Sequence, residues 1–352
     1  MSSPPIWPDF RRRMLPIRIL GDRLSRRLDG RALLAGSLIL FFAIGLAGVS
    51  LATGYYPVTP AQVATAFLQP DTDVIRMIVV EWRLPRVGLA FLLGGALGLS
   101  GAIFQSLTRN PLGSPDIIGF SAGSYTGALA AILLLSGGYY ETAAGALVGG
   151  IVTALAVYLF AYRRGVQGFR LIIVGIGVSA MLGALNAWMI READLQVAMS
   201  AAIWGAGSLN GLGIDQLLPV LLVLALLVPP MLVLARPMRQ LEMGDDAARA
   251  SGVNAGRVRL SLMVLGVALT ATVTAAAGPI AFIALAAPQI ARRLIRSPGV
   301  TLLPSALVGA LLLTAADWAA QHAFSNQLPV GMMTVSIGGF YFLWLLVREG
   351  RT

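Results

Sequence analysis

Few side chains in this sequence could take part in covalent or metal chemistry. Cysteine is absent, which excludes disulfides, thiolate metal sites and cysteine nucleophiles. All 26 basic residues are arginine, so the phosphate-binding loop with its lysine and Schiff-base chemistry are both excluded. The single histidine, His322, cannot build a histidine metal site. These absences leave few groups for catalysis or metal binding, and if ATP drives this protein, another chain hydrolyses it.

A polar segment, residues 236–257, interrupts the otherwise apolar second half of the chain. We interpret it as two short helices joined by a glycine turn, a projection that can sit in the cleft of a partner and transmit its motion. An ordinary solvated loop is the alternative. The residues that would make the contact are Leu241, Glu242, Gly244, Asp245, Asp246, Arg249 and Gly252.

Asp317 is the one acidic residue clearly at the edge of a long apolar stretch. An ionisable group at such a position could be a proton site. It could also be a carboxylate that caps a helix or pairs locally at the outer end of the stretch, and we favour this second interpretation. His322, five residues further on, is expected at the surface.

The elements that carry these residues are predicted to be membrane-spanning helices. The chain is 57% hydrophobic and 12% charged, about half the charged fraction of an ordinary soluble domain. Uncharged runs of about 20 residues recur, and each is long enough to cross a bilayer as a helix. One longer run is divided at Gly278-Pro279, where proline removes a backbone donor. The predicted spans are residues 33–53, 86–107, 116–136, 142–162, 170–190, 215–235, 258–277, 280–296, 301–317 and 329–347.

Clusters of arginine predict the orientation of these ten spans. The clusters lie at residues 11–31, 163–170, 236–259, 292–296 and 348–351, and the positive-inside rule makes all of them cytoplasmic. Both termini are then cytoplasmic, with residues 1–31 as a basic tail on anionic lipid and residues 32–352 as the membrane domain. The net charge of +10 reflects this orientation, and no nucleic-acid partner is expected. With Arg109 also on the cytoplasmic side, four arginines remain outside: Arg76, Arg83, Arg86 and Arg191.

The most informative motifs follow one another between residues 83 and 119. They are R-L-P-R at 83–86, a glycine-rich span that ends S-G-A-I-F-Q at 100–105, and R-N-P-L-G-S-P-D-I-I-G at 109–119. Gly94, Gly98 and Gly101 share one helical face, as small residues do at close helix crossings. This series resembles the iron-chelate and cobalamin ABC importer permeases. The resemblance continues at Leu171–Leu185, Trp204–Gly211, Leu241–Arg259, Ala275–Arg292, Ala315–Trp318 and Leu328–Gly339.

The resemblance implies an all-α polytopic protein of about ten transmembrane helices, with type II ABC importer permease architecture and inverted half-repeats. It implies a transport subunit that is not an enzyme, binds no cofactor or metal, and provides alternating access for an iron(III)-siderophore complex across the bacterial inner membrane. The implied partners are two copies of a cytoplasmic ABC ATPase, a periplasmic or lipid-anchored substrate-binding protein and a second permease subunit, either identical or a paralogue. The phrases F-I-A-L-A-A-P-Q-I-A-R-R and G-G-F-Y-F-L-W-L-L favour the ferric catecholate (enterobactin-like) subgroup.

Individual roles also follow from the resemblance. Residues 236–257 would be the coupling loop that the ATPase grips, and Arg83 and Arg86 would dock the binding protein. The alternative for these two arginines is a pair of interfacial anchors. A cytoplasmic gate would be formed by Asn110, Leu112, Gly168 and Phe169.

Several residues depart from the family pattern. Gln289 stands where relatives often have histidine, Gln321 where some have arginine, and Phe169 is bulkier than the small hydroxyl residues of some relatives. Two other classes compete with the importer. An ion-coupled secondary transporter would need ionisable or unwound polar sites at mid-membrane, and a membrane enzyme would need a carboxylate pair inside a span. The predicted spans are almost free of both.

Overall fold

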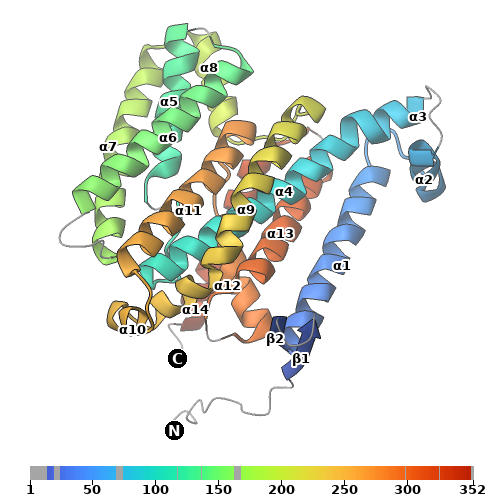
Figure 1. The fold of residues 1–352 in the computed structure, drawn as a ribbon. Coiled ribbons are helices and arrows are strands. Elements are labelled where there is room, and N and C mark those ends of the chain that lie inside the picture. Colours follow the sequence, from blue (N-terminus) through green and yellow to red (C-terminus); the bar gives the residue numbers. More distant parts are fainter. Residues whose placement is uncertain are drawn as a thin grey trace.

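The computed structural model describes residues 14–19, 24–68, 74–116, 118–135, 137–161, 168–297, 299–324 and 326–349, and the statements below concern these residues. Helices dominate the fold (Figure 1). They are α1 (Gly30–Ala52), α2 (Pro60–Leu68), α3 (Val74–Arg76), the π-helix η1 (Met77–Arg83), α4 (Leu84–Thr108), α5 (Phe120–Leu135), α6 (Tyr139–Ala161), α7 (Gly168–Glu192), α8 (Leu195–Gly205), α9 (Ile214–Glu242), α10 (Asp245–Ala250), α11 (Ala255–Ala277), α12 (Ile283–Ile295), α13 (Leu302–His322) and α14 (Val330–Glu349). The predicted all-helical, polytopic fold is confirmed.

Seven helical stretches among the described residues are long and apolar enough to cross a membrane. They are α1, the continuous stretch from α3 to α4, α6, α7, α9, α11 and α13. The other three predicted spans coincide with α5, α12 and α14. Helix α1 begins, and α14 ends, at the same end of the bundle as α10 (Figure 1). We call this the α10 end and the opposite one the Asp317 end.

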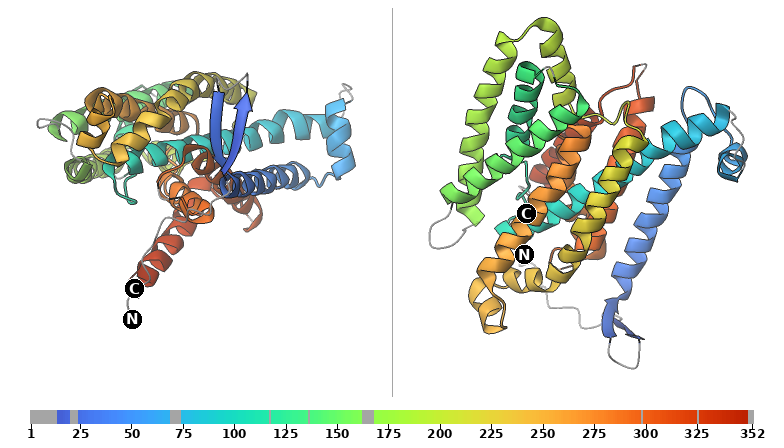
Figure 2. Two further views of the ribbon diagram at one scale, coloured as in Figure 1. Left: turned by 60° about the horizontal axis from the view of Figure 1, so that its bottom comes forward. Right: turned by 45° about the horizontal axis from the view of Figure 1, so that its top comes forward.

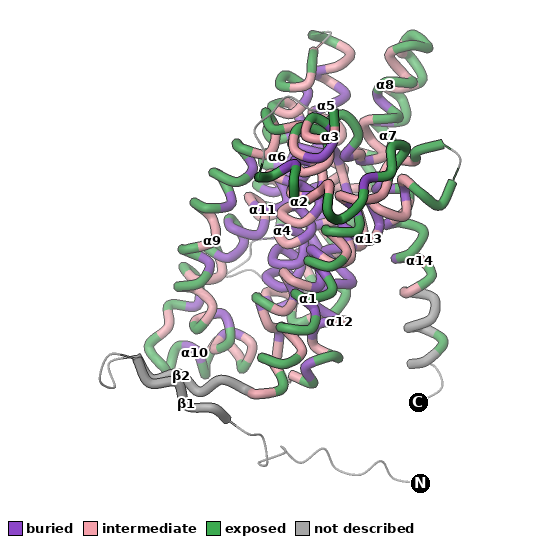
Figure 3. The backbone as a smooth tube through the Cα atoms, turned by 90° about the vertical axis from the view of Figure 1, so that its right-hand side faces the viewer, coloured by how far each residue is buried: buried purple, intermediate pink, exposed green. Residues whose placement is uncertain are grey.

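Helix α4 forms the centre of the bundle. In its most apolar window 78% of the residues are buried, against 11% in α1, and the buried residues gather along its axis (Figure 3). Gly94 and Gly98 face α13 so closely that an added Cβ would overlap the carbonyl groups of Gly309 and Ser305. Gly101 meets the backbone of Ala284 in α12 in the same way. The predicted glycine face is therefore confirmed as a helix-packing surface.

The periphery of the bundle carries large apolar side chains. Phe41 on α1, Met181 on α7 and Leu226 on α9 are exposed, together with many neighbours on the same helices. In water such a surface would be a large exposed apolar patch, whereas in a bilayer these side chains would contact lipid acyl chains. The outer helices therefore present the surface that a bilayer would cover.

The stretch 260–291 forms two helices, α11 and α12, that are divided at the predicted break. Helix α11 ends at Ala277, and Gly278 has a φ of 73°. The segment after α8 packs against this break. Ser208 N–H donates to the Ala277 carbonyl at 2.8 Å, and the backbone of Trp204 and Gly207 lies so close to Gly278 that an added Cβ would overlap the Trp204 carbonyl oxygen. Backbone groups exposed by the break thus find partners within the protein, as a membrane interior requires.

Four features of the fold were not expected from the sequence. The π-helix η1 continues α4 toward the Asp317 end, and α2 lies between the first two predicted spans. Helix α14 diverges from the bundle toward its C-terminal end (Figure 2). Two short strands, β1 (Met14–Ile19) and β2 (Leu24–Asp29), pair antiparallel within the predicted tail. The rest of that tail, residues 1–13 and 20–23, and Arg163, Arg164 and Arg351 of the arginine clusters lie outside the described residues.

Candidate functional site

The segment between α9 and α11 contains one short helix, α10, where the sequence had suggested two. Helix α9 does not stop near Arg236 but continues to Glu242, because Met238 and Leu241 still face the core and are almost fully buried. Gly244 has a φ of 120° and Gly252 a φ of 83°. These left-handed conformations favour glycine, and they turn the chain sharply on both sides of α10.

An ionic cluster fixes α10 to its neighbours. Asp245, the first residue of α10, accepts hydrogen bonds at 2.7 Å from the guanidinium groups of both Arg109 and Arg259. Arg109 also donates to the carbonyl oxygen of Leu241 from Nη2 at 2.8 Å and from Nε at 3.2 Å. Partial burial raises the pKa of Asp245, but the hydrogen bonds and charges of Arg259 and Arg109 outweigh that effect and lower the pKa below its ordinary value. Asp245 is therefore held as a carboxylate.

The predicted coupling residues divide into an inner and an outer group. Leu241 is buried and, together with Ala248, which was not among the predicted residues, attaches the segment to the core. The side chains of Asp246 and Arg249 are 101% and 68% exposed and form a 3.7 Å ion pair on the outer surface. Such a surface pair adds little to stability, so these two side chains are free to contact a partner.

The connection from α4 to α5 begins beside this cluster. Arg109 ends α4 in a left-handed conformation with a φ of 50°. The Asn110 side-chain oxygen then accepts the Leu112 backbone N–H at 2.9 Å, which closes a tight turn. Gln289 of α12 donates to the Pro111 carbonyl at 2.8 Å. Two of the predicted gate residues, Asn110 and Leu112, thus lie in a turn that is tied to α12.

The other two predicted gate residues lie at the start of α7. Helix α7 begins at Gly168, and Phe169 is 76% exposed. Leu171, one turn further in, packs with Phe104 and Ile118 of α4 and of the connection. The structure therefore brings the start of α7 against the α4–α5 connection through this apolar cluster, while the Phe169 ring itself points outward.

Further along the connection, Asp116 joins three parts of the chain that the sequence did not relate. Its Oδ1 accepts the Ser121 hydroxyl at 2.6 Å, and the carboxylate also accepts the backbone N–H of Phe282. Phe282 precedes α12 with a φ of 68°, unusual for a residue other than glycine. A Cβ on Gly338 of α14 would overlap the Phe282 side chain. Asp116 thus connects the start of α5 with the start of α12.

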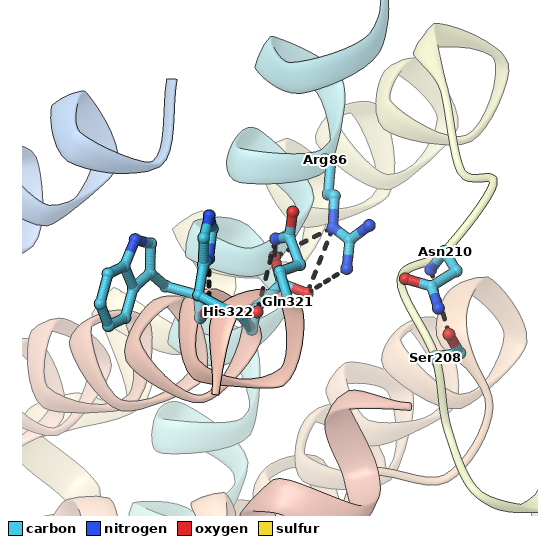
Figure 4. A network of polar contacts seen from close by, with 7 residues as sticks. Arg86, Ser208, Asn210, Gln321 and His322 are labelled. Carbon is cyan, nitrogen blue, oxygen red and sulfur yellow. Dashed lines mark hydrogen bonds and ion pairs between the residues drawn. The ribbon is translucent and has the colours of Figure 1, made fainter. Parts of the chain in front are cut away.

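The Asp317 end contains a buried ion pair between α4 and α13 (Figure 4). Arg86 donates to Asp317 from Nη2 at 2.9 Å and from Nε at 3.1 and 3.3 Å. Only 15% of the Arg86 side chain and 4% of the Asp317 side chain are exposed. The Gln321 side-chain amide also donates to Asp317, at 2.8 Å to Oδ2. The expectation that Asp317 pairs locally is confirmed, and its partner is one of the two predicted docking arginines.

Arg83, the other predicted docking arginine, is also bound within the chain. It donates to the carbonyl oxygens of Leu51 at 2.8 Å and Tyr56 at 2.6 Å, and so holds the loop after α1. Nearby, His322 is exposed and stacks on Trp318 with 5.0 Å between ring centroids. The sequence contained a sign of the ion pair, since spans 86–107 and 301–317 have opposite charges at the same predicted membrane face.

Two cavities open near α8, and neither has the ligands of a metal centre. One, of about 440 Å³, is mainly apolar and lies between α5, α7 and the break before α12; its lining includes Ser121, Tyr125, Asn186, Gly205 and Pro279. The second, of about 430 Å³, is lined by residues that include Tyr139, Gln196, Ser200 and Trp204. Within the described ranges, no three His, Cys, Asp or Glu side chains lie close enough together to hold a metal ion.

Comparisons with known proteins agree over nearly the whole chain. The sequence model of the FecCD transport family matches residues 38–348. The ferric enterobactin transport system permease protein of Escherichia coli is 50% identical, over 91% of this chain and 98% of that protein. The achromobactin transport system permease protein of Dickeya dadantii is 35% identical, over 93% and 95%. A solved structure described as an inward-facing metal-chelate type ABC transporter superposes with a TM-score of 0.79 at 26% identity, over 89% of this chain and 98% of that one.

Proposed function

Because this chain belongs to the FecCD transport family, as a multi-pass permease subunit of a bacterial ABC importer that is not itself catalytic, we propose that its cargo is a ferric siderophore of the catecholate class. The observation that carries this proposal is the 50% identity to the ferric enterobactin permease across 98% of that protein's length. The identity to the achromobactin permease is only 35% over a similar length.

We further propose that the α10 end faces the cytoplasm and the Asp317 end the outside. The arginines at the α10 end support this orientation, since Arg249 lies on α10 and Arg109 and Arg259 pair with Asp245 at its start. Two copies of an ATPase would then contact the outer side of α10 at Asp246 and Arg249. A substrate-binding protein, periplasmic or lipid-anchored, would deliver the siderophore at the Asp317 end.

In this mechanism the chain supplies a pathway whose access alternates between the two ends. A second permease subunit, either an identical copy or a paralogue, completes the pathway. Closure of the ATPase pair would move α10, and the ionic cluster at Asp245 would pass that movement to α4 and α11. The turn at Asn110 and Leu112 and the start of α7 would then open or close the cytoplasmic side.

Reconstitution tests the proposal directly. The permease pair, its ATPase and its binding protein are placed in liposomes, and uptake of ⁵⁵Fe-enterobactin is measured with and without ATP. A ferric hydroxamate and a ferric citrate complex serve as competing cargoes. We expect ATP-dependent uptake of the catecholate in preference to both. Equal uptake of a hydroxamate would contradict the cargo, and uptake driven by an ion gradient alone would identify a secondary transporter.

A further inference from the structure

Arg109 lies where the end of α4, the end of α9 and the start of α10 meet. We infer that Arg109 is a positioning residue that transmits movement of α10 to the turn at Asn110–Leu112, and that Asp245 is its counterpart on α10. This inference rests on the proposed function, since it assigns a route for the ATPase-driven movement. Neither the arginine clusters nor the motif that contains Arg109 gave this residue such a role.

The conformation of Arg109 is specialised for this contact. Its φ of 50° lies in the left-handed region, which residues with a side chain seldom adopt. Its backbone N–H still closes α4 by donating to the carbonyls of Gln105 and Ser106. The left-handed turn therefore ends the helix at one residue and sends the following chain directly into the turn, while the side chain of Arg109 reaches back to α9 and α10.

The guanidinium of Arg109 makes a forked contact with two elements. Nη2 binds both the Leu241 carbonyl at 2.8 Å and Asp245 at 2.7 Å, and Nε binds the same carbonyl at 3.2 Å. A cation is favoured at the C-terminal end of α9, and a planar fork fixes direction as well as distance. A rotation of α10 that moves Asp245 must therefore either move Arg109 or break this contact.

The residues after Arg109 form a short rigid unit. Asn110 closes the turn through Leu112 N–H, and the Pro111 carbonyl is held by Gln289 of α12. The turn is thus attached to α10 through Arg109 and to α12 through Gln289. Relative movement of α10 and α12 has to change the conformation of residues 109–112, and that is where two of the proposed gate residues lie.

The experiment measures how many iron complexes enter per ATP hydrolysed by the reconstituted importer. Arg109→Gln removes the charge and the fork, and Asp245→Asn removes the negative charge of the counterpart while keeping an oxygen that can accept a hydrogen bond. For each we expect the ATPase to bind and hydrolyse ATP within about twofold of wild type, while the ratio of uptake to hydrolysis falls about tenfold, in the range of known coupling between sites. Because both act through one contact, the double variant should be no worse than the more severe single variant. Arg109→Lys should be intermediate, since lysine can reach one acceptor but has no fork.

A second readout reports movement of the turn itself. The natural chain has no cysteine, so Leu112→Cys introduces a unique thiol at a partly exposed position. In the otherwise wild-type importer its maleimide labelling should change when ATP is added, and with Arg109→Gln that change should be lost. Arg191→Gln, an exposed arginine near the far end of α7, is the matched control and should keep both uptake and the nucleotide response.

The outcomes distinguish the proposed transport function from the positioning role of Arg109. Absence of ATP-driven uptake in the wild-type importer contradicts the proposed function itself. If the wild type transports and Arg109→Gln keeps a normal uptake-to-hydrolysis ratio and labelling response, the positioning role is wrong. Loss of ATPase binding in Asp245→Asn or Arg109→Gln also overturns it, since the cluster would then form the docking surface instead of a link behind it.

Discussion

The buried pair of Arg86 and Asp317 allows a quantitative prediction. Asp317→Ala removes one partner and leaves a guanidinium that is only 15% exposed. Breaking a buried pair from one side costs about 3–5 kcal/mol, because the remaining charge has neither water nor a counterion. Since Arg86 binds the carboxylate through two nitrogens, we expect the free energy of unfolding to fall by about 3 kcal/mol.

Replacement of both partners should behave differently. In the double variant Arg86→Met/Asp317→Leu no charge remains buried, and exchange of a buried pair for apolar residues is often neutral or stabilising. Gln321 loses its acceptor, but it is partly exposed and can bind water. We therefore expect the double variant to lie within about 1 kcal/mol of wild type. With the matching single variants Arg86→Met and Asp317→Leu, this gives a coupling energy of about 3 kcal/mol or more in a double-mutant cycle.

The assay is equilibrium unfolding in mixed micelles titrated with a denaturing detergent and followed by circular dichroism. A loss below about 1 kcal/mol in Asp317→Ala, or a double variant whose loss is the sum of the two single losses, would refute the reasoning. The double variant also separates structure from docking. If Arg86 contacts the binding protein as well, the double variant stays folded and yet binds that protein more weakly, whereas a purely structural pair leaves the binding affinity unchanged.

Three further predictions follow from packing, protonation and surface contacts. Gly98→Ala should lower the free energy of unfolding by about 1–3 kcal/mol, because the new Cβ would overlap the Ser305 carbonyl. Gly45→Ala on α1 is the control: no atom lies within 4 Å of its new Cβ, so it should be neutral or slightly stabilising in the same unfolding assay. The pKa of Asp245 is lowered in the folded protein, so its pairing stabilises the fold above the ordinary carboxyl pKa of about 3.9 and this stabilisation is lost as the pH falls through the lower, folded-state value. The stability difference between wild type and Asp245→Asn should therefore disappear in acid. A difference that persists in acid would contradict this assignment of the pairing. The double variant Asp246→Ala/Arg249→Ala should change the free energy of unfolding by less than about 0.5 kcal/mol but weaken ATPase binding in a pull-down or titration. Unchanged binding would show that the ATPase does not contact these two side chains.

The sequence predicted the helices well because two strong signals agree, long uncharged runs and clustered arginines. Helix α1 ends at Ala52, and the break in residues 260–291 falls at Gly278-Pro279. The glycine face of α4 could be predicted because small residues at helical spacing have one common use in membranes. These features depend on local composition, which a single sequence contains in full.

Tertiary partners were harder to predict, since they depend on which helix ends meet. The contact between Arg86 and Asp317 joins residues 231 positions apart, and only shared sidedness hinted at it. The prediction of two short helices in residues 236–257 was wrong, because the buried side chains of Met238 and Leu241 extend α9 beyond Arg236, where the polar segment begins. The left-handed conformations of Arg109 and Phe282 had no sequence signal, because neither residue type favours that geometry.

The glycine contact between α4 and α13 also restricts how this permease can change shape. At Gly94, Gly98 and Gly309 the two backbones touch with no side chains between them. Helices packed backbone against backbone have no side chains between them that could rearrange to permit sliding or rolling. We therefore expect α4 and α13 to move as one rigid body. Any opening of the pathway then has to involve elements outside this rigid pair, such as the break before α12 and the diverging α14.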